Sequence, residues 1–389
     1  MTIANGAQHS MSYVLESTFG TTPASPTLTP LRHTGTTVGL SKTGLESAEL
    51  RSDRQVKDFR HGNKNNAGDI NIEMSYGSHD DFLQAAFAGT WTTQVDSGLL
   101  TIGVAPNGSG ADFTRSTGSF LTDTFAAGDI ITVSGFTDAG GNGRFVITNV
   151  VALVITATPI EGQTVPTEAG GADEQIICEA NLRTGIVRRS FTLQRYFSDV
   201  TQYLVYTGFN FNTFSLDVAP DQIVTATFGG IGKSQTVSGT IISGATYGAE
   251  TTTSPFDSFT GAIRDNGADI AVVTSLSVSL DNGMSPLFVV GSSETLQPSI
   301  ARSRLTGSMT VYFEDTTILN KFINETETTL QFSLTDAAGN DYIFYMPRVK
   351  YNSGQPDVTS EDPVTLTVDF VALLDSVSGT NIVIDRVPA

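Results

Sequence analysis

The chain has 389 residues, more than one compact core usually holds, so two or three domains are expected. Its formal net charge of -19 argues against ordinary nucleic-acid binding, because phosphate contacts normally require lysine and arginine. The single cysteine, Cys178, excludes an intrachain disulfide and is expected to be a small buried residue, and no apolar stretch reaches the roughly 18 residues of a membrane span.

Residues 1–35 are predicted to form an arm. Pro23, Pro26 and Pro30 lack an amide donor, which argues against a central strand or a helix there. Apolar residues such as Phe19 would anchor the arm on its own domain or on a neighbouring subunit. No basic segment followed by an apolar run occurs here, so no secretory signal is expected.

The next segment is rich in charge and poor in large apolar residues. Its cations are Lys42, Arg51, Arg54, Lys57, Arg60 and Lys64, with acidic residues among them. One interpretation is a solvated, flexible loop. The interpretation that we favour is a long hairpin whose cations contact a neighbouring subunit with an acidic surface.

Most of the remaining chain alternates between apolar and polar residues, as half-buried antiparallel strands do. The clearest examples are residues 214–219, 275–280, 309–313, 330–334 and 364–370. Two segments, Asp80–Gly89 and Asp315–Asn324, instead show helical spacing of apolar residues, with acidic or capping residues at their starts. The fold class expected is therefore all-β with minor α.

The two helices reveal a repeat. Gly68–Tyr76 and Gly307–Asp315 each begin with glycine, continue as an alternating strand and lead into a helix. This pattern indicates two tandem β-sandwich or barrel domains, although a chance recurrence of strand and helix is the alternative. The predicted division is an arm at 1–35, a first domain at 36–92 with 175–235, an inserted outer β-domain at 93–174, and a second domain at 236–389.

No catalytic, cofactor or metal site is expected. The histidines, His9, His33, His61 and His79, lack the spacing of a metal-binding helix. The glycines at 229–234 lack the spacing of a phosphate-binding loop.

Several segments resemble the tail tube proteins of long-tailed bacteriophages. They are Arg54–Ile70, Glu73–Gly77, Asp80–Trp91, Phe228–Ser234, Leu280–Gly283, Phe313–Asp315, Asn320–Glu327, Pro347–Tyr351 and Gly379–Ile384. The resemblance covers nearly the whole chain except 93–174, which looks like the decoration-type domains inserted in such proteins.

The resemblance implies a non-enzymatic virion protein of the tail, assembled in the host cytoplasm into stacked rings that conduct DNA during ejection. Two fused domains per chain would give trimeric, pseudo-hexameric rings in preference to hexamers. The loop at about 42–66 would pack against the next ring. Implied partners are further copies of the chain, the tape measure, tail terminator and distal tail proteins, and passing DNA without tight binding, but no membrane.

The polar faces of the strands would line the channel, unless they simply meet solvent. The candidates are Asp69, Asn71, Glu73, Ser215, Asp217, Ser275, Ser277, Ser279, Thr306, Ser308, Thr310, Thr365, Thr367 and Asp369. The alternative function is a virion decoration or adhesin protein built from β-domains.

Overall fold

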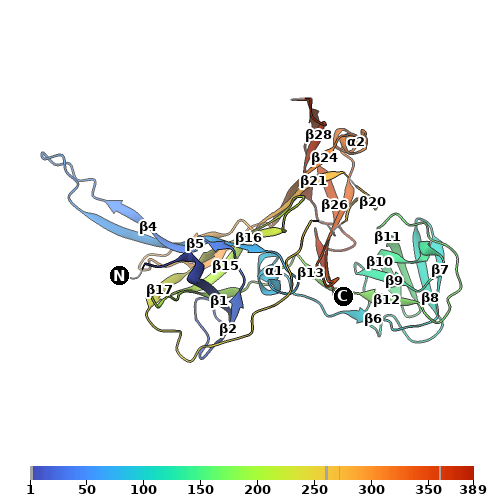
Figure 1. The fold of residues 1–389 in the computed structure, drawn as a ribbon, viewed down its shortest axis with the longest axis horizontal. Helices are drawn as coiled ribbons and strands as arrows, with labels where there is room; N and C mark the ends of the chain where they lie inside the picture. The colour runs from blue at the N-terminus through green and yellow to red at the C-terminus, as the bar shows by residue number, and fades with distance from the viewer. Residues whose placement is uncertain (1–2, 259–261, 271, 359–360) are drawn as a thin grey trace.

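The computed structural model describes residues 3–258, 262–270, 272–358 and 361–389, so the first two residues of the expected arm lie outside it. The molecule is elongated and consists mainly of strands, with a long hairpin at one end and a small β unit at the other (Figure 1). This confirms the all-β class with minor α. Among the described helices, none has the length and apolar character needed to cross a membrane.

We call the chain before the insertion, together with its continuation after the insertion as far as residue 238, the N-terminal unit. Its elements are η1 (Gly6–Gln8), β1 (His9–Glu16), β2 (Thr27–Leu31), β3 (Gly35–Thr36), β4 (Gly39–Glu46), β5 (Phe59–Glu73), α1 (Asp80–Ala86), β13 (Ala180–Arg183), β14 (Ser190–Phe197), β15 (Gln202–Val218), β16 (Thr225–Gly232) and β17 (Ser234–Ser238).

The C-terminal unit follows a connecting segment that contains β18 (Thr246–Tyr247). Its elements are β19 (Ile263–Asp265), β20 (Ala268–Asp269), β21 (Val273–Asp281), β22 (Ser285–Leu287), β23 (Leu296–Ser299), β24 (Arg304–Tyr312), α2 (Thr317–Ile323), β25 (Thr328–Thr335), β26 (Asp341–Tyr351), β27 (Gln355–Asp357), β28 (Thr365–Ala372) and β29 (Val383–Val387).

The two units have the same strand order. In the N-terminal unit one layer runs β4, β5, β16, β15, and in the C-terminal unit it runs β21, β24, β28, β26. The second layer runs β17, β15, β14, β1 in the first case and β29, β26, β25, β19 in the second. Each long strand, β15 or β26, bends from one layer into the other.

The segment expected to be an arm lies on its own unit. β1 pairs with β14 from His9 to Glu16, in the place that β19 takes in the C-terminal unit. The carboxylate of Glu16 is buried and accepts hydrogen bonds from Ser190 and Thr192 (2.7 and 2.8 Å). Because β1 pairs with β14 along its full length, it is part of the folded N-terminal unit.

The two helices pack differently. In α1, Phe82, Leu83, Ala85 and Ala86 are buried, whereas α2 has no fully buried residue. Thr316 occupies the N-cap position of α2 without a side-chain cap hydrogen bond, and the carboxylate of Asp315 just before it accepts a hydrogen bond from the amide of Thr317 at 2.7 Å.

The first turn of α1 also joins the two units. Asp80 accepts hydrogen bonds from the hydroxyl of Tyr342 and from Arg386, both in the C-terminal unit. Trp91 stacks on Tyr342 with ring centroids 6.1 Å apart, and the guanidinium of Arg386 lies over the indole. These contacts hold the two units at one angle.

The inserted unit has a seven-stranded sheet and a core of its own. Its elements are β6 (Val95–Asp96), β7 (Ile102–Asn107), β8 (Gly110–Arg115), β9 (Ile130–Ser134), η2 (Ala139–Gly141), β10 (Gly143–Val151), β11 (Val154–Pro159) and β12 (Gln175–Cys178). The sheet therefore continues past residue 174, as far as Cys178.

Although it interrupts the N-terminal unit, the inserted unit packs on the C-terminal one. Ile130 and Ile160 contact Tyr345 and Val383 in a small apolar cluster. Beside this cluster, the buried guanidinium of Arg144 pairs with the buried carboxylate of Asp385 and donates to Gln331 (3.0 Å). Burial lowers the pKa of Arg144 to about 10.

Replacing Arg144 with leucine should weaken this contact strongly. Asp385 would remain buried without its cation, which typically costs about 3–5 kcal/mol. Tryptic cleavage at increasing urea concentrations should show that the inserted unit separates from the C-terminal unit at a lower urea concentration than in the parent chain. The double variant Arg144→Leu/Asp385→Leu should recover most of the loss, and Arg51→Leu, which breaks an exposed pair with Asp53, should leave the midpoint unchanged. An unchanged midpoint in Arg144→Leu would contradict this account.

Candidate functional site

The two units share one continuous sheet because β15 pairs with β21. The register runs from Thr213 opposite Asp281 to Val218 opposite Leu276. The joint places β4, β5, β16, β15, β21, β24 and β28 side by side. Sequence analysis did not predict this pairing.

One face of the sheet is apolar and buried. It includes Ile70, Ile72, Phe214, Leu216, Phe228, Leu276, Val278, Leu305, Met309, Leu366, Val368 and Phe370, which all belong to the main core. The two helices and the second strand layer cover this face (Figure 1). Replacing one buried phenylalanine of such a core with alanine typically lowers the free energy of unfolding by about 3–5 kcal/mol. The packing of this face therefore holds the sheet against the helices and the second strand layer.

The candidate channel residues lie together on the opposite face. One row across the strands contains Glu73, Thr225, Asp217, Ser277, Ser308 and Asp369, and the next contains Asn71, Thr227, Ser215, Ser279 and Thr306. A third row contains Ser275, Thr310 and Thr367, Thr365 lies opposite Tyr312, and Asp69 lies opposite Gly229. That this face lines a channel remains a prediction.

The charges of the polar face are mainly acidic. Asp69, Glu73, Asp217, Asp281 and Asp369 project from it, and Arg304 lies opposite Asp281. Hydroxyl groups fill most of the space between them, for example Thr310 and Thr367, whose oxygens are 3.1 Å apart. Such a wall repels phosphate and offers few strong donors to it.

Both ends of the sheet are open edges in the described part of the chain. At one end, β3 and β4 pair with β5 on their inner side only; at the other, β27 pairs with β28 only. Unpaired strand edges readily recruit another chain. These edges are therefore candidate assembly surfaces.

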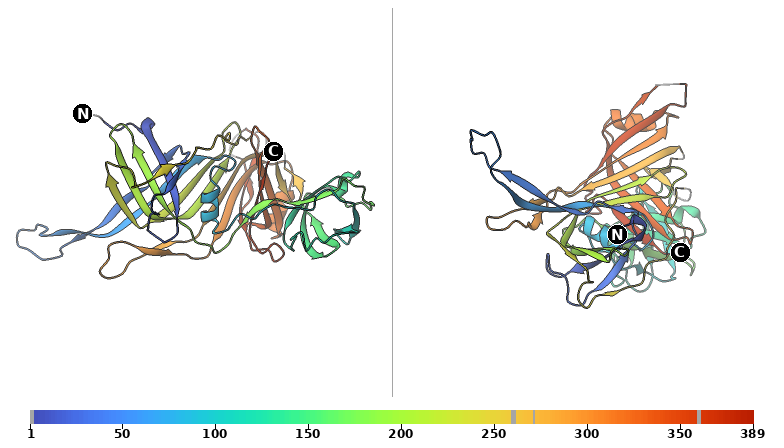
Figure 2. Two further views of the ribbon diagram at one scale, coloured as in Figure 1. Left: turned by 90° about the horizontal axis from the view of Figure 1, so that it is seen from below. Right: turned by 60° about the vertical axis from the view of Figure 1, so that its left-hand side comes forward.

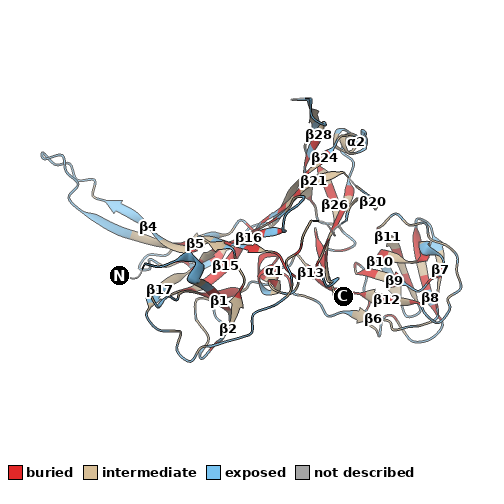
Figure 3. Ribbon diagram, in the orientation of Figure 1, coloured by how far each residue is buried: buried red, intermediate tan, exposed pale blue. Residues whose placement is uncertain are grey.

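The charged segment forms a hairpin of β4 and β5 that projects far from the body and is largely exposed (Figure 3). It carries all six candidate contact residues, namely Lys42, Arg51, Arg54, Lys57, Arg60 and Lys64. Arg51, Lys57 and Arg60 pair with acids of the same hairpin, at 2.7, 3.2 and 3.1 Å. Lys64 pairs with Glu294 at 3.0 Å. Whether these cations contact another subunit remains a prediction.

Glu294 belongs to a second projection, residues 282–303, which sequence analysis missed. This second hairpin connects β21 to β24, as the first connects β4 to β5, and both project from the same end of the molecule (Figure 2). Exposed apolar residues occur on both, including Leu50 and Val56 on the first and Val289 and Val290 on the second. The signal available in the sequence was the repeat itself, which requires a counterpart of the first loop.

A chain of hydrogen bonds supports the open edge at β3. Arg195 donates through Nη1 to the carbonyl of Val38 (2.7 Å) and through Nε to Nε2 of His9 (3.1 Å). Nδ1 of His9 therefore carries the proton and donates to Nε2 of His33 (2.9 Å), whose Nδ1 donates to the carbonyl of Leu31 (3.1 Å). Every link requires both rings to be neutral.

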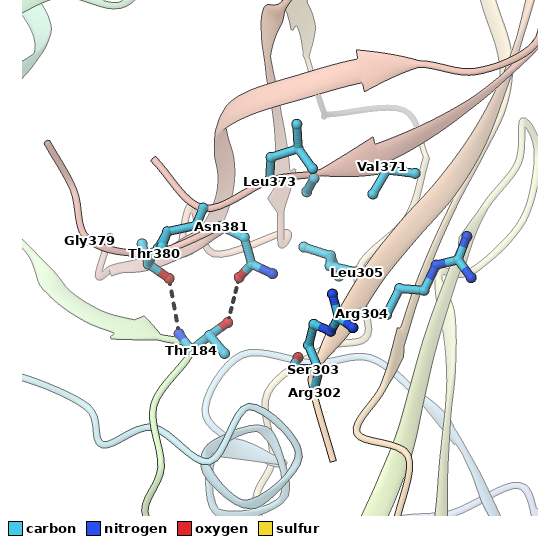
Figure 4. A pocket seen from close by; sticks show the side chains of 12 residues that line it. Thr184, Arg302, Ser303, Arg304, Leu305, Val371, Leu373, Gly379, Thr380 and Asn381 are labelled. Atoms are coloured by element: carbon cyan, nitrogen blue, oxygen red, sulfur yellow. Dashed lines mark hydrogen bonds between the residues drawn. The ribbon is translucent and has the colours of Figure 1, made fainter. Parts of the chain in front are cut away.

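In the described residues, no group of three or more histidine, cysteine, aspartate or glutamate side chains is arranged to hold a metal ion. Cys178 is buried, which raises the pKa of its thiol to about 12. A cavity of about 760 Å³ lies at the ends of β24 and β28 (Figure 4).

Comparison with known proteins adds one finding. A family model described as phage tail tube protein matches residues 6–372, which spans the N-terminal unit, the insertion and the C-terminal unit as far as the end of β28. No curated protein matches the sequence.

The neutral histidines predict loss of stability in acid. Burial and the nearby Arg195 lower the pKa of His9 to about 4, burial lowers that of His33, and burial lowers that of His79 to about 4. An unfolded histidine titrates near 6.5, so between about 6.5 and 4 the unfolded chain binds more protons than the folded one. The free energy of unfolding should therefore fall as pH falls through this range.

Denaturant unfolding at several pH values checks this expectation. His9→Gln should flatten the dependence, because one depressed histidine is gone, whereas His61→Gln, on the exposed hairpin, should not change it. Equal slopes for the parent chain and His9→Gln would contradict the role assigned to His9.

Proposed function

The chain belongs to the phage tail tube protein family, and from this premise we propose that copies of it close into rings that stack as the tube conducting DNA during ejection. The observation that carries the proposal is the joint between β15 and β21. It shows how one unit of this fold accepts the next at a sheet edge.

The open edges are the counterparts of the two strands in that joint. Ser215 lies opposite Thr227, and Gln355 of β27 lies opposite Thr367, which has the same place in the repeat. Ser279 lies opposite Thr306 of β24, and Gly39 has the same relation to Ala67 of β5. Because Ser215 pairs with Ser279, Gln355 of one chain should pair with Gly39 of the next.

Repetition of one edge-to-edge contact is heterologous and closes into a ring if the rotation fits. Two units of like topology in each chain support a ring of three chains with pseudo-sixfold symmetry over one of six. Closure would also remove the exposed edges.

In such a ring the polar face would line the channel, because helices and the second strand layer already cover the other face. Its carboxylates would keep the phosphate backbone from adhering, so that DNA passes without tight binding. We place the protein in the virion tail after assembly in the host cytoplasm. The tape measure, tail terminator and distal tail proteins are the partners that this role requires.

Cysteines at Gln355 and Gly39 test the ring. Assembled material should form interchain disulfides, and the covalent ladder on a non-reducing gel should end at three chains because the third bond closes the ring. The pair Ser215→Cys/Ser279→Cys, which lies across the observed joint, should cross-link within one chain and serves as the geometric control. Absence of the interchain bond in material that forms tubes by negative-stain microscopy would overturn this edge pairing.

Charge reversal tests the channel. Replacing Asp69, Glu73 and Asp217 with lysine should leave tubes intact but slow or stall ejection, because phosphate would then bind the wall. The matched control replaces three exposed acids of the inserted unit, Asp96, Asp138 and Asp173, and should leave ejection unchanged. Ejection at the parental rate in the first variant would remove these residues from the channel.

A further inference from the structure

The cavity at the ends of β24 and β28 is a concave feature that the proposed ring does not yet use. It has a volume of about 760 Å³, and its walls include Leu305, Val371 and Leu373. Across from the strand ends, Thr184 closes it by hydrogen bonds to Thr380 and Asn381 (3.3 and 2.7 Å; Figure 4). The pocket thus lies in the C-terminal unit and is closed on one side by the segment that follows β13.

The rim of this cavity carries unused positive charge. Arg302 and Arg304 are exposed, and within the described ranges neither takes part in an ion pair. Leu374, on the same rim, is 66% exposed. An apolar hollow with two free cations fits a segment that brings apolar and acidic side chains together.

The corresponding place in the N-terminal unit is already covered by the second hairpin. There, the amide of Lys64 donates to the carbonyl of Ser293 (2.8 Å), and its ammonium pairs with Glu294 (3.0 Å). Arg188 donates to the carbonyl of Pro298, and this proline is buried.

The root of the second hairpin is held as well. The side chain of Asn282 donates to the carbonyls of Ala86 and Asn212, at 2.8 and 3.1 Å. Thr295, farther along the hairpin, is only 2% exposed. Within one chain, the hairpin of one unit therefore rests on the unit beside it.

The repeat relates the two places residue by residue. Asn65 lies opposite Ser41, and Arg304 lies opposite Asp281, at the same position of each unit. One residue earlier, Lys64 corresponds to Ser303, which lines the cavity. Counting forward from Asp281 and Ser41, Ser293 of the second hairpin corresponds to Asp53 of the first. Counting back from Arg304 and Asn65, it corresponds to Arg54, because the first hairpin is one residue longer.

Within the described residues of the single chain, the outer part of the first hairpin rests on no other unit (Figure 1). Leu45 and Phe59 are 59% and 53% exposed. Near its tip are two acids, Glu49 and Asp53. It thus offers apolar surface and two carboxylates that are held only by exposed ion pairs with Arg51 and Lys57 of the same hairpin.

Building on the proposed ring, we propose that the cavity is the seat of the first hairpin from a second copy of this chain in the same ring. Residues 49–54 of that copy lie over Ser303, and Asp53 or Glu49 pairs with Arg302, which is one residue before the position equivalent to Lys64. Each hairpin of the ring then rests with its tip on the neighbouring unit of the same ring.

Cysteines at Ser303 and Asp53 test the seat. In assembled tubes we expect an interchain disulfide whose ladder ends at three chains. The pair Lys64→Cys/Ser293→Cys, across the observed equivalent contact, should cross-link within one chain. A ladder that continues beyond three chains would place the hairpin on another ring and overturn the proposal.

The Gln355–Gly39 pair separates the two proposals. If that pair cross-links and the Ser303–Asp53 pair does not, the ring stands and the seat is wrong. If neither pair cross-links, ring closure itself fails. A charge test is independent of cysteine geometry: Arg302→Glu should lower the temperature at which tubes dissociate, and adding Asp53→Arg should restore it. No restoration would count against the proposed ion pair.

Discussion

The pairing of β15 with β21 is the constraint on which the remaining structure depends. A strand edge presents donors and acceptors that need partners, and here one unit supplies them to the next along a full register. The joint carries the apolar face of one unit into that of the other, so a single core lies behind both. It also leaves the outer edges of the pair, at β3 and β27, without the partner that the inner edges have found.

A sheet that extends through several units needs a fixed angle between them. Asp80 and Trp91 supply this on one side, through contacts with Tyr342 and Arg386 of the C-terminal unit. The inserted unit adds a second tie, because it leaves the chain beside α1 and is bound to Asp385 through Arg144. β13, which follows the insertion, pairs with β29 as a third. Two hydrogen-bonded layers and a buried ion pair thus limit hinge motion between the units.

Much of this could be predicted from the sequence, and the rest could not for a physical reason. A period of two fixes which side chains share a face, so Glu73, Asp217 and Ser277 were assigned to one surface before their strands could be placed. The same period says nothing of which strand lies next to which. The partner of β15, and that of β1, are set by contacts far apart in sequence. The second hairpin escaped notice because its charges are few, although the repeat required it.

The insertion has a consequence for symmetry. It occurs once in a chain that contains two similar units, and it is bound on the outer layer of the C-terminal one. A wall built from both units would be almost uniform to a molecule travelling through its middle. The exterior would instead carry one inserted unit for every two sheet units, so its repeat would be twice as long as that of the channel wall. A protein that binds the outer surface of the tube would then meet one inserted unit for every two sheet units.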